Sequence, residues 1–384
     1  GVVIRGHKYT SEVQLIKINS PFAVEFLAFC DIIVSKRILI APLDWGLGHA
    51  TRCIPLISHL LETGHQPIIG SSGRPMKLLK GEFPDVESVE LDGYNISYPE
   101  GSGMAWKMFK STPHILRRIR EERTELEGLI GPLKLDAVIS DNRFGLFTDK
   151  IPSVYVTHQV MIKAPFFESV LYRIHANYMK NFSEVWVPDF EKDGLSGDLS
   201  HKYLLPANAK HIGSLSRFGQ RKTSNELDVL VLISGPEPQR TRFEKTILRQ
   251  LEEFSGTATA VLGTPDLKLD KLDSRNHRIV SHLNADELET EMAKASLVIS
   301  RSGYSTIMDL SALGKKAAFV PTPGQTEQEY LAKKYQKEGK HLSMSQRKLD
   351  LALAWKTRGD FQGFSSRIGN DYKSILNQFV AKLS

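Results

Sequence analysis

The chain alternates short runs of aliphatic and β-branched residues with longer amphipathic runs, and it does so in two separate series. The first series begins with the strand pattern of residues 37–43, and the second begins with that of residues 228–233. Strands separated by helices indicate βαβ units and parallel sheets. A length of 384 residues accommodates two domains of ordinary size. The sequence therefore predicts an α/β protein with two Rossmann-like, doubly wound domains.

Breaks in this alternation suggest where the domains begin and end. The stretch 214–226 is polar and interrupts the alternation, so we expect it to link a first domain, 36–213, to a second, 227–365. The pattern of apolar residues over 366–384 predicts one amphipathic helix. Residues 1–35 are an N-terminal extension to which we assign no role. A long helical pattern over 106–129 contains Pro113, where we expect the helix to break.

Composition excludes several classes of protein. The two cysteines, Cys30 and Cys53, do not form a CxxC pattern, which argues against a disulfide framework and a zinc site. There is no apolar stretch of about 20 residues for a membrane-spanning helix. A formal net charge of +6 is a mild excess that selects no partner. We expect a cytoplasmic protein that does not bind nucleic acid, since no basic recognition helix or aromatic stacking platform is evident.

A glycine loop directly follows the first strand. In open α/β sheets ligands bind at the carboxyl ends of the strands, where a helix N-terminus offers free N–H groups. Gly46 and Gly48 let the backbone approach such a ligand, and His49 begins the next helix. Thr51 stands where a dinucleotide fingerprint requires its third glycine, so an NAD enzyme is disfavoured. His49 is either a polar group at the cleft that we expect between the two domains or an ordinary helix-start residue.

Three further loops in the second half have the same position at the end of a strand. Small and hydroxyl residues suit the oxygens of a diphosphate, and Asp309, one turn into its helix, could accept both hydroxyls of a ribose. The alternative for Asp309 is stabilisation of the helix dipole, and the alternative for Arg240 is a solvated side chain. Amide and carboxylate groups in the last loop suit the hydroxyls of a sugar. The loops supply Ser234, Gly235 and Arg240; Ser302, Gly303, Tyr304, Ser305, Thr306 and Asp309; and Gln325, Glu327 and Gln328.

Metal-binding patterns are missing from the sequence. It contains no Asp-x-Asp pair and no cluster of His, Cys and Asp at metal spacing. A transferase that expels a diphosphate without a metal must stabilise it with backbone amides and helix dipoles. We therefore expect a metal-independent reaction without a cofactor beyond the nucleotide-sugar substrate.

The run from Ser300 to Gln328 resembles the donor domain of family 28 glycosyltransferases, which include the peptidoglycan N-acetylglucosaminyltransferases and the galactolipid synthases. The resemblance implies the GT-B fold, with two facing Rossmann-like domains and a C-terminal helix that crosses back to the first. It also implies inverting chemistry with a nucleoside-diphosphate sugar, with uracil as the expected base.

The same resemblance implies roles for individual residues. Asp309 would bind the donor ribose, the small residues around Ser302 and Ser234 the diphosphate, and Gln325 and Gln328 the donor sugar. Gly46, Gly48, His158 and Gln159 would lie on the acceptor side. His49 is our candidate for the catalytic base because a histidine titrates near neutral pH, and Asp44 is the reserve candidate.

The function predicted is transfer of a hexose or N-acetylhexosamine from a UDP-sugar to a hydroxyl acceptor, either lipid-linked or glycan. A nucleotide-sugar 2-epimerase of the same fold and a non-catalytic nucleotide-sugar-binding protein remain as alternatives. Aromatic and cationic residues mix over 104–120, a pattern typical of a helix that docks on anionic lipid at the inner face of the cell membrane. An ordinary surface helix with a buried apolar face is the competing interpretation.

Overall fold

The computed structural model describes residues 34–44, 46–94, 104–163, 168–219, 221–264, 272–273 and 276–383, without the side chains of 104–115 and 272–273. Most of the expected N-terminal extension therefore lies outside the described residues. Lys36–Ser384 form one compact unit, and the description that follows concerns this unit.

The first half builds a parallel sheet whose described strands run in the order β3-β2-β1-β4-β5-β6-β7. The middle strands are buried on both faces, as parallel strands between two helix layers require. Their bounds are β1 Arg37–Pro42, β2 Gln66–Ser71, β3 Ser88–Glu90, β4 Ala137–Asp141, β5 Ser153–Val156, β6 Glu184–Val187 and β7 Ala209–His211.

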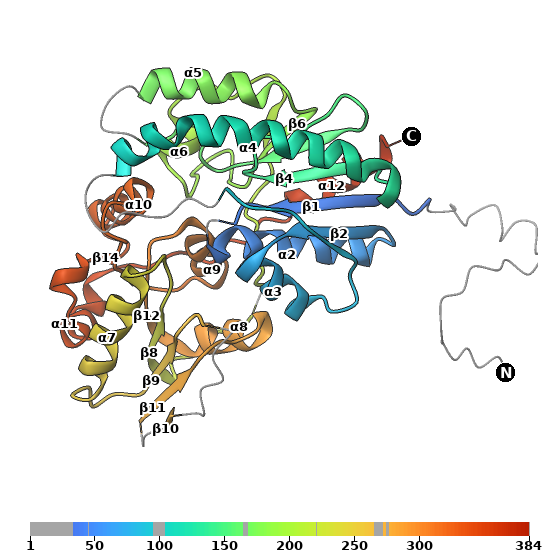
Figure 1. The fold of residues 1–384 in the computed structure, drawn as a ribbon. Helices are drawn as coiled ribbons and strands as arrows, with labels where there is room; N and C mark the ends of the chain where they lie inside the picture. The colour runs from blue at the N-terminus through green and yellow to red at the C-terminus, as the bar shows by residue number, and fades with distance from the viewer. Residues whose placement is uncertain are drawn as a thin grey trace, which may run out of the picture. The chain divides into compact units, whose positions relative to one another are not determined.

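Helices cover both faces of this sheet. In Figure 1, α2 and α3 lie on one side, and α4 and α5 lie on the other. Side-chain packing gives the same two helix layers. Ile38 and Ile40 of β1 pack in one core with Ile54 of α2, whereas Leu39 packs in another core with Leu126 of α4. The helices are α2 Leu47–Glu62, α3 Gly73–Glu82, α4 Met104–Leu133, α5 Glu168–Met179 and α6 Asp198–His201.

The second half repeats this architecture. Its described strands run in the order β10-β11-β9-β8-β12-β13-β14, all parallel except the pair β10 and β11. The strands are β8 Leu227–Leu232, β9 Ala258–Val261, β10 Leu272–Asp273, β11 His277–Val280, β12 Ala295–Ser300, β13 Ala317–Phe319 and β14 Leu342–Ser343. The helices are α7 Gln239–Leu251, α8 Ala285–Lys294, α9 Tyr304–Leu313, α10 Thr326–Lys337, α11 Leu351–Lys356 and α12 Asp371–Ala381, with the 3-10 turns η1 Gln346–Lys348 and η2 Arg358–Asp360.

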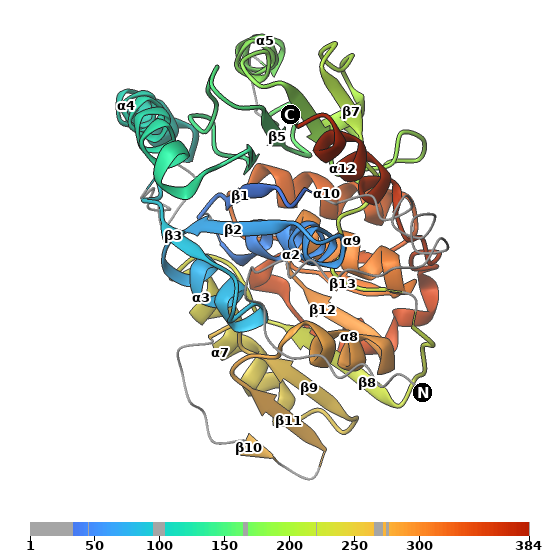
Figure 2. The same ribbon diagram turned by 90° about the vertical axis from the view of Figure 1, so that its right-hand side faces the viewer.

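These two sheets with helices on both faces confirm the predicted fold class, and Figure 2 shows both in a second orientation. The C-terminal helix α12 returns to the first half as expected, where Phe379 packs edge-on against Trp186 of β6 and Asn377 hydrogen-bonds to His59 of α2 at 2.8 Å. The expected domain boundaries at 213 and 227 remain a prediction.

Two expectations about helices are wrong. The helix over Pro113 does not break, because α4 runs unbroken from Met104 to Leu133. A proline removes one backbone hydrogen bond, and packing of buried residues such as Leu126 on the sheet outweighs that loss. The last helix begins at Asp371 instead of Ser366. Before it, the chain crosses the start of the linker so closely that a Cβ on Gly369 would lie 2.3 Å from the backbone nitrogen of Ser214.

Candidate functional site

Four helices begin directly after strands that end at the carboxyl edges of the two sheets. They are α2 after β1, α7 after β8, α9 after β12 and α10 after β13. Gly46 begins α2 with φ of 89° and ψ of 173°, a conformation that only glycine adopts without strain. These four loops carry most of the residues that the sequence singles out.

The N-termini of α2 and α9 touch. The Ser305 hydroxyl donates to the Gly48 carbonyl at 2.7 Å. A Cβ on Gly48 would lie 3.1 Å from the Ser305 hydroxyl oxygen. Glycine at 48 therefore permits the close approach of the two helices. The glycine loop of the first half and the loop of the second half that carries Ser302 and Ser305 are thus in direct contact.

His49 contacts a buried ion pair formed by Arg52 and Asp141. The Arg52 guanidinium bonds both oxygens of Asp141, which ends β4, and the His49 Nδ1 lies 3.3 Å from Asp141 Oδ2. Burial raises the pKa of Asp141, but the charge of Arg52, the contact with His49 and the hydrogen bonds from both residues together outweigh it and lower the pKa to about 2. Burial, and then the charge of Arg52, lower the pKa of His49. Asp141 is therefore ionised and His49 neutral at physiological pH.

The predicted acceptor-side pair meets a predicted donor residue across the two halves. His158 Nε2 lies 2.9 Å from Glu327 Oε1, and the Gln159 amide donates to the other oxygen of the same carboxylate. The His158 ring stacks on Tyr304 at 4.3 Å between centroids, and the Tyr304 hydroxyl donates to the Pro188 carbonyl at 2.8 Å. Burial raises the pKa of Glu327, but the contacts with His158 and the effects of the more distant His49 and Arg52 together outweigh it, and the pKa is lowered.

The start of α9 combines open backbone with hydroxyl groups. A Cβ on Gly303 would meet no atom within 4 Å, so the turn is open there, and Thr306 lies half-buried in the first turn. The Ser302 hydroxyl donates to the Gln328 carbonyl at 2.7 Å. Among the described residues, the buried hydroxyls of Ser300 and Thr322 at this edge have no hydrogen-bond partner. Both oxygens are enclosed by protein atoms, and a buried unpaired hydroxyl costs about 1–3 kcal/mol of stability.

Asp309 is buried one turn into α9 and is held by the linker. The Ser216 hydroxyl donates to its Oδ1 at 2.8 Å, and Arg217 Nε lies 3.4 Å from Oδ2. Burial raises the pKa of Asp309, and the nearby Arg217 only partly offsets it. The carboxylate predicted to bind ribose therefore also anchors the segment between the two sheets.

The loop before α7 is tied to its neighbours by an arginine inside the hydroxyl-rich motif. Arg301 is 1% exposed and donates to the carbonyls of Ser234 at 3.3 Å, Gln239 at 3.0 Å and Val320 at 2.9 Å. Its guanidinium also lies over the ring of Phe243. Arg301 thereby fixes three strand-end loops relative to one another. Gly235, with φ of 113°, lies within this set of loops.

The remaining predicted residues have other neighbours. Arg240 is largely buried and bonds Glu237 and Glu244, so its charge is already paired. The Gln328 side chain accepts from the Thr322 backbone at 2.8 Å, and Gln325 is the residue before α10. Asp44 packs over Gly93, where a Cβ would lie inside its carboxylate, and lies 3.4 Å from the Tyr94 backbone nitrogen. Among the described residues, Asp44 and His49 share no hydrogen bond or ion pair.

Arg52, Asp141 and Arg301 are site residues that sequence reasoning did not single out. Arg52 follows His49 by three residues, a spacing that places both side chains on one face of a helix. Asp141 ends a strand that neighbours β1, which the alternation alone does not reveal.

Among the described residues, no group of three or more His, Cys, Asp or Glu side chains could hold a metal ion.

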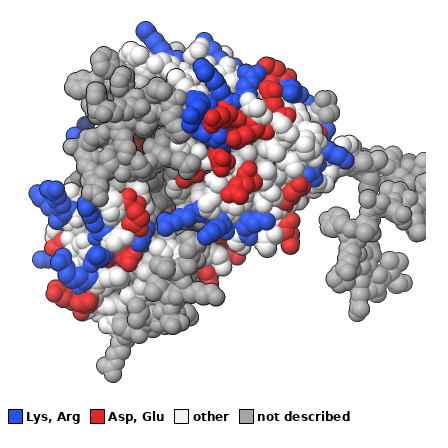
Figure 3. Space-filling view, viewed as in Figure 1, with Lys and Arg blue, Asp and Glu red and all other residues white. Residues whose placement is uncertain are grey.

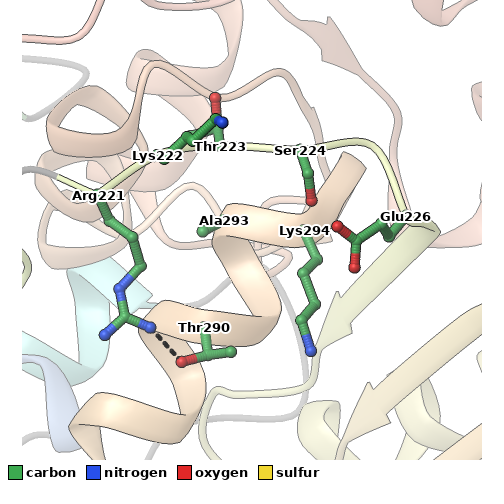
Figure 4. Close-up of a pocket in the computed structure, with 8 residues that line it drawn as sticks. All are labelled: Arg221, Lys222, Thr223, Ser224, Glu226, Thr290, Ala293 and Lys294. Atoms are coloured by element: carbon green, nitrogen blue, oxygen red, sulfur yellow. Dashed lines mark hydrogen bonds between the residues drawn. The ribbon is translucent and has the colours of Figure 1, made fainter.

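A pocket of about 430 Å³ lies away from these loops, between the linker and α8. Figure 4 shows Arg221 reaching Thr290 at its edge, and the pocket is lined by Arg221, Lys222, Thr223, Ser224, Glu226, Thr290, Ala293 and Lys294. Glu289 lies 3.3 Å from Arg221, and Glu291 lies 3.8 Å from Lys294, so these two cations are partly neutralised.

Charged side chains of α4 are also paired. Arg118 bonds Glu125 and Arg123 bonds Glu127 along the helix, and on the face in Figure 3 positive and negative side chains are interspersed. In the part of the chain that the structure describes, no helix has the length and apolarity needed to cross a bilayer.

Comparison with known proteins identifies the domain that carries the donor loops. Residues 266–357 match the glycosyltransferase family 28 C-terminal domain. The chain is 25% identical over 268 residues to the UDP-N-acetylglucosamine–N-acetylmuramyl-(pentapeptide) pyrophosphoryl-undecaprenol N-acetylglucosamine transferase of Caldicellulosiruptor saccharolyticus. The aligned region covers 65% of this chain and 70% of the relative. It is also 25% identical over 340 residues to a glycosyltransferase of Methanosarcina acetivorans, which spans 79% of this chain and 84% of the relative.

Solved structures agree with the fold. The glycosyltransferase SnogD from Streptomyces nogalater matches with a TM-score of 0.59 at 14% identity over 91% of this chain and 100% of that one. The spinosyn rhamnosyltransferase SpnG complexed with thymidine diphosphate matches with a TM-score of 0.55 at 12% identity, over 90% and 96% of the two chains. The chain therefore has the GT-B fold and carries the C-terminal domain of family 28, and it is a glycosyltransferase.

Proposed function

We propose that this glycosyltransferase is inverting and metal-independent, and that it moves a hexose or N-acetylhexosamine from a UDP-sugar to a hydroxyl acceptor. The observation that carries the proposal is the meeting of the α2 and α9 N-termini beside His49, which contacts the buried Asp141. An acceptor hydroxyl and a donor diphosphate could be brought together at that point.

The α9 edge supports a donor diphosphate site. Its helix N-terminus supplies N–H groups and a positive dipole end, and the unpaired hydroxyls of Ser300 and Thr322 lie at the same edge. Asp309 lies one turn further along, at the place where we propose that a carboxylate binds the ribose hydroxyls. The relative from Caldicellulosiruptor saccharolyticus is named for a UDP-N-acetylglucosamine donor, which favours UDP over dTDP as the nucleotide.

For the reaction we propose direct displacement at the anomeric carbon. His49 takes the proton of the acceptor hydroxyl, the acceptor oxygen forms the new glycosidic bond, and the nucleoside diphosphate leaves with the electron pair of the broken bond. Because its pKa is lowered, His49 is unprotonated at neutral pH. To use its Nε2 as the base, His49 must carry its own proton on Nδ1, which lies next to Asp141.

For the acceptor we propose a lipid-linked hydroxyl compound. The same relative is named for a pyrophosphoryl-undecaprenol acceptor. In this chain α5 exposes Val170 by 47% and Ile174 by 53%, four residues apart on one helix face, with Arg173 exposed beside them. Apolar side chains next to a cation suit peripheral contact with an anionic membrane surface.

The test of the donor site is calorimetric titration of the protein, in the presence of EDTA, with UDP, GDP, dTDP, ADP and NAD. We expect selective binding of UDP. In Asp309→Asn, loss of the charge should weaken UDP binding by about 1–3 kcal/mol, because hydrogen bonds to charged groups are worth about that much.

Asp350→Asn is the matched control, because Asp350 caps α11 with its side chain and lies outside the proposed site. Asparagine also caps helices, so this variant should bind UDP as the wild type does. Absence of UDP binding, or equal affinities in Asp309→Asn and Asp350→Asn, would contradict the donor site proposed here.

A further inference from the structure

One buried side chain contacts three polar residues of the first half that lie near its contacts with the second half. Arg52 is 2% exposed, and besides its bonds to Asp141 it places Nη2 2.8 Å from His49 Nδ1 and Nη1 2.9 Å from His158 Nδ1. His158 is 5% exposed and Asp141 is fully buried. Arg52 therefore links two histidines that are far apart in the sequence.

The chemistry of these groups fixes where the histidine protons lie. A guanidinium has N–H donors and no acceptor, and it stays charged in proteins. A nitrogen that accepts from Arg52 must carry a lone pair, so both His49 and His158 must have Nδ1 unprotonated. A neutral imidazole carries its single proton on the other nitrogen, Nε2.

For His158 this proton faces the second half. Its Nε2–H can donate only to an acceptor, and Glu327 Oε1 lies 2.9 Å away. The chain of contacts from Arg52 through His158 to Glu327 is therefore consistent in direction, with a donor facing an acceptor at every step. The stack of His158 on Tyr304 keeps the ring in this orientation.

For His49 two neighbours compete for one nitrogen. Arg52 Nη2 lies 2.8 Å from Nδ1, while Asp141 Oδ2 lies 3.3 Å from it. The shorter contact requires a lone pair on Nδ1, and the longer contact requires a proton there. The base proposed above needs the second arrangement, whereas the observed distances favour the first.

We propose that Arg52 is a positioning residue that holds both His49 and His158 as Nε2–H tautomers, so that His158 orients Glu327 and His49 rests in a form that cannot yet act as a base. This inference rests on the proposed function for the roles of His49 and Glu327. Activation of His49 then consists of moving its proton from Nε2 to Nδ1. The Nδ1–H donates a hydrogen bond to Asp141, and the hydrogen bond from Arg52 to Nδ1 is lost. The change needs no more than a tautomer shift and a small adjustment of the ring toward Asp141.

The experiment is nitrogen-15 NMR of the full chain labelled at its histidines, with His49→Asn and His158→Asn used to assign the signals. We expect both histidines at pH 7.5 to show an unprotonated Nδ1 and a protonated Nε2. Arg52→Met, which removes the donors but keeps the apolar stem, should give averaged signals from both tautomers. Arg242→Met, which removes an exposed arginine from α7, should leave both patterns unchanged.

Titration of the His49 signal gives a second measure. The charged and titratable groups that face His49 are Arg52 on α2, Asp141 on β4, His158 after β5 and Glu327 on α10. Loss of the Arg52 charge should raise the His49 midpoint by about one pH unit, since a neighbouring charge shifts a pKa by at least that much. A residue that acted only through packing would not shift this midpoint.

The wild-type spectrum alone can overturn the inference, even if Arg52→Met does not fold. A protonated Nδ1 on His158 would mean that Arg52 does not donate to it, and unchanged tautomers in folded Arg52→Met would also refute the proposal. No nucleotide is needed for these spectra. Failure here with intact UDP binding would reject the role of Arg52 only, and failure of UDP binding with the expected tautomers would reject the donor assignment only.

Discussion

Replacement of Asp141 by asparagine should remove a large part of the stability of the first half. The carboxylate is fully buried and bonded twice by Arg52. Its pKa falls from the usual 3.8 to about 2 on folding, a shift that corresponds to about 2 kcal/mol. The Asp141→Asn variant also leaves the Arg52 charge buried without its partner, and breaking such pairs costs about 3–5 kcal/mol. We expect a loss of about 3 kcal/mol.

The assay is urea denaturation at pH 7, followed by tryptophan fluorescence and by far-ultraviolet circular dichroism, whose agreement establishes a single transition. A double-mutant cycle with Arg52→Met separates the ion pair from packing. Because the double variant leaves neither charge buried alone, its loss should be at least about 2 kcal/mol smaller than the two single losses added together.

The pH dependence supplies the sign of the effect. The pKa of Asp141 is lower in the folded protein than in the unfolded chain, so its contribution is complete above about pH 4 and is lost as the pH falls toward about 2. This part of the acid sensitivity should be absent in Asp141→Asn. An Asp141→Asn protein as stable as the wild type, or additive losses in the cycle, would refute the reasoning.

Three other substitutions test single features. Burial lowers the pKa of His341 to about 3, so the folded protein binds fewer protons at this residue than the unfolded chain below pH 6.5 and loses stability as the pH falls. When the pH is lowered from 6.5 to 5, His341→Asn should therefore lose about 2 kcal/mol less stability than the wild type, as measured by urea titration. Gly46→Ala should cost about 1–3 kcal/mol through backbone strain alone, since no atom lies near the added Cβ, and an unchanged melting temperature would contradict this. Tyr304→Phe should cost about 1 kcal/mol by losing its bond to Pro188, and chemical denaturation measures this loss.

Much of the fold could be predicted because the pattern that predicts it is local. Buried parallel strands such as residues 37–42 are continuous aliphatic runs, and the helices after them begin at small-residue loops. The wrong expectations involve tertiary contacts. Pro113 predicts a break in α4, yet the packing of that helix on the sheet keeps it continuous. The start of α12 depends on how residue 369 crosses the linker, which no local pattern encodes.

The candidate site could be predicted only in part for a similar reason. Loops at strand ends mark where ligands bind, so His49 and the residues around Ser302 follow from the sequence. The partners of these residues do not, because Asp141 follows His49 by 92 residues and Glu327 follows His158 by 169. The contacts within the cleft arise from the arrangement of two sheets, and a pattern read along one chain does not contain that arrangement.

The return of α12 to the first half has a consequence for synthesis on the ribosome. Trp186 of β6 obtains its edge-on contact with Phe379 only after nearly the whole chain has been made. Domains usually fold in the order in which they are synthesised. The packing beside β6 is therefore complete only when α12 is present, and a nascent chain arrested before α12 lacks the cover that Phe379 gives to Trp186.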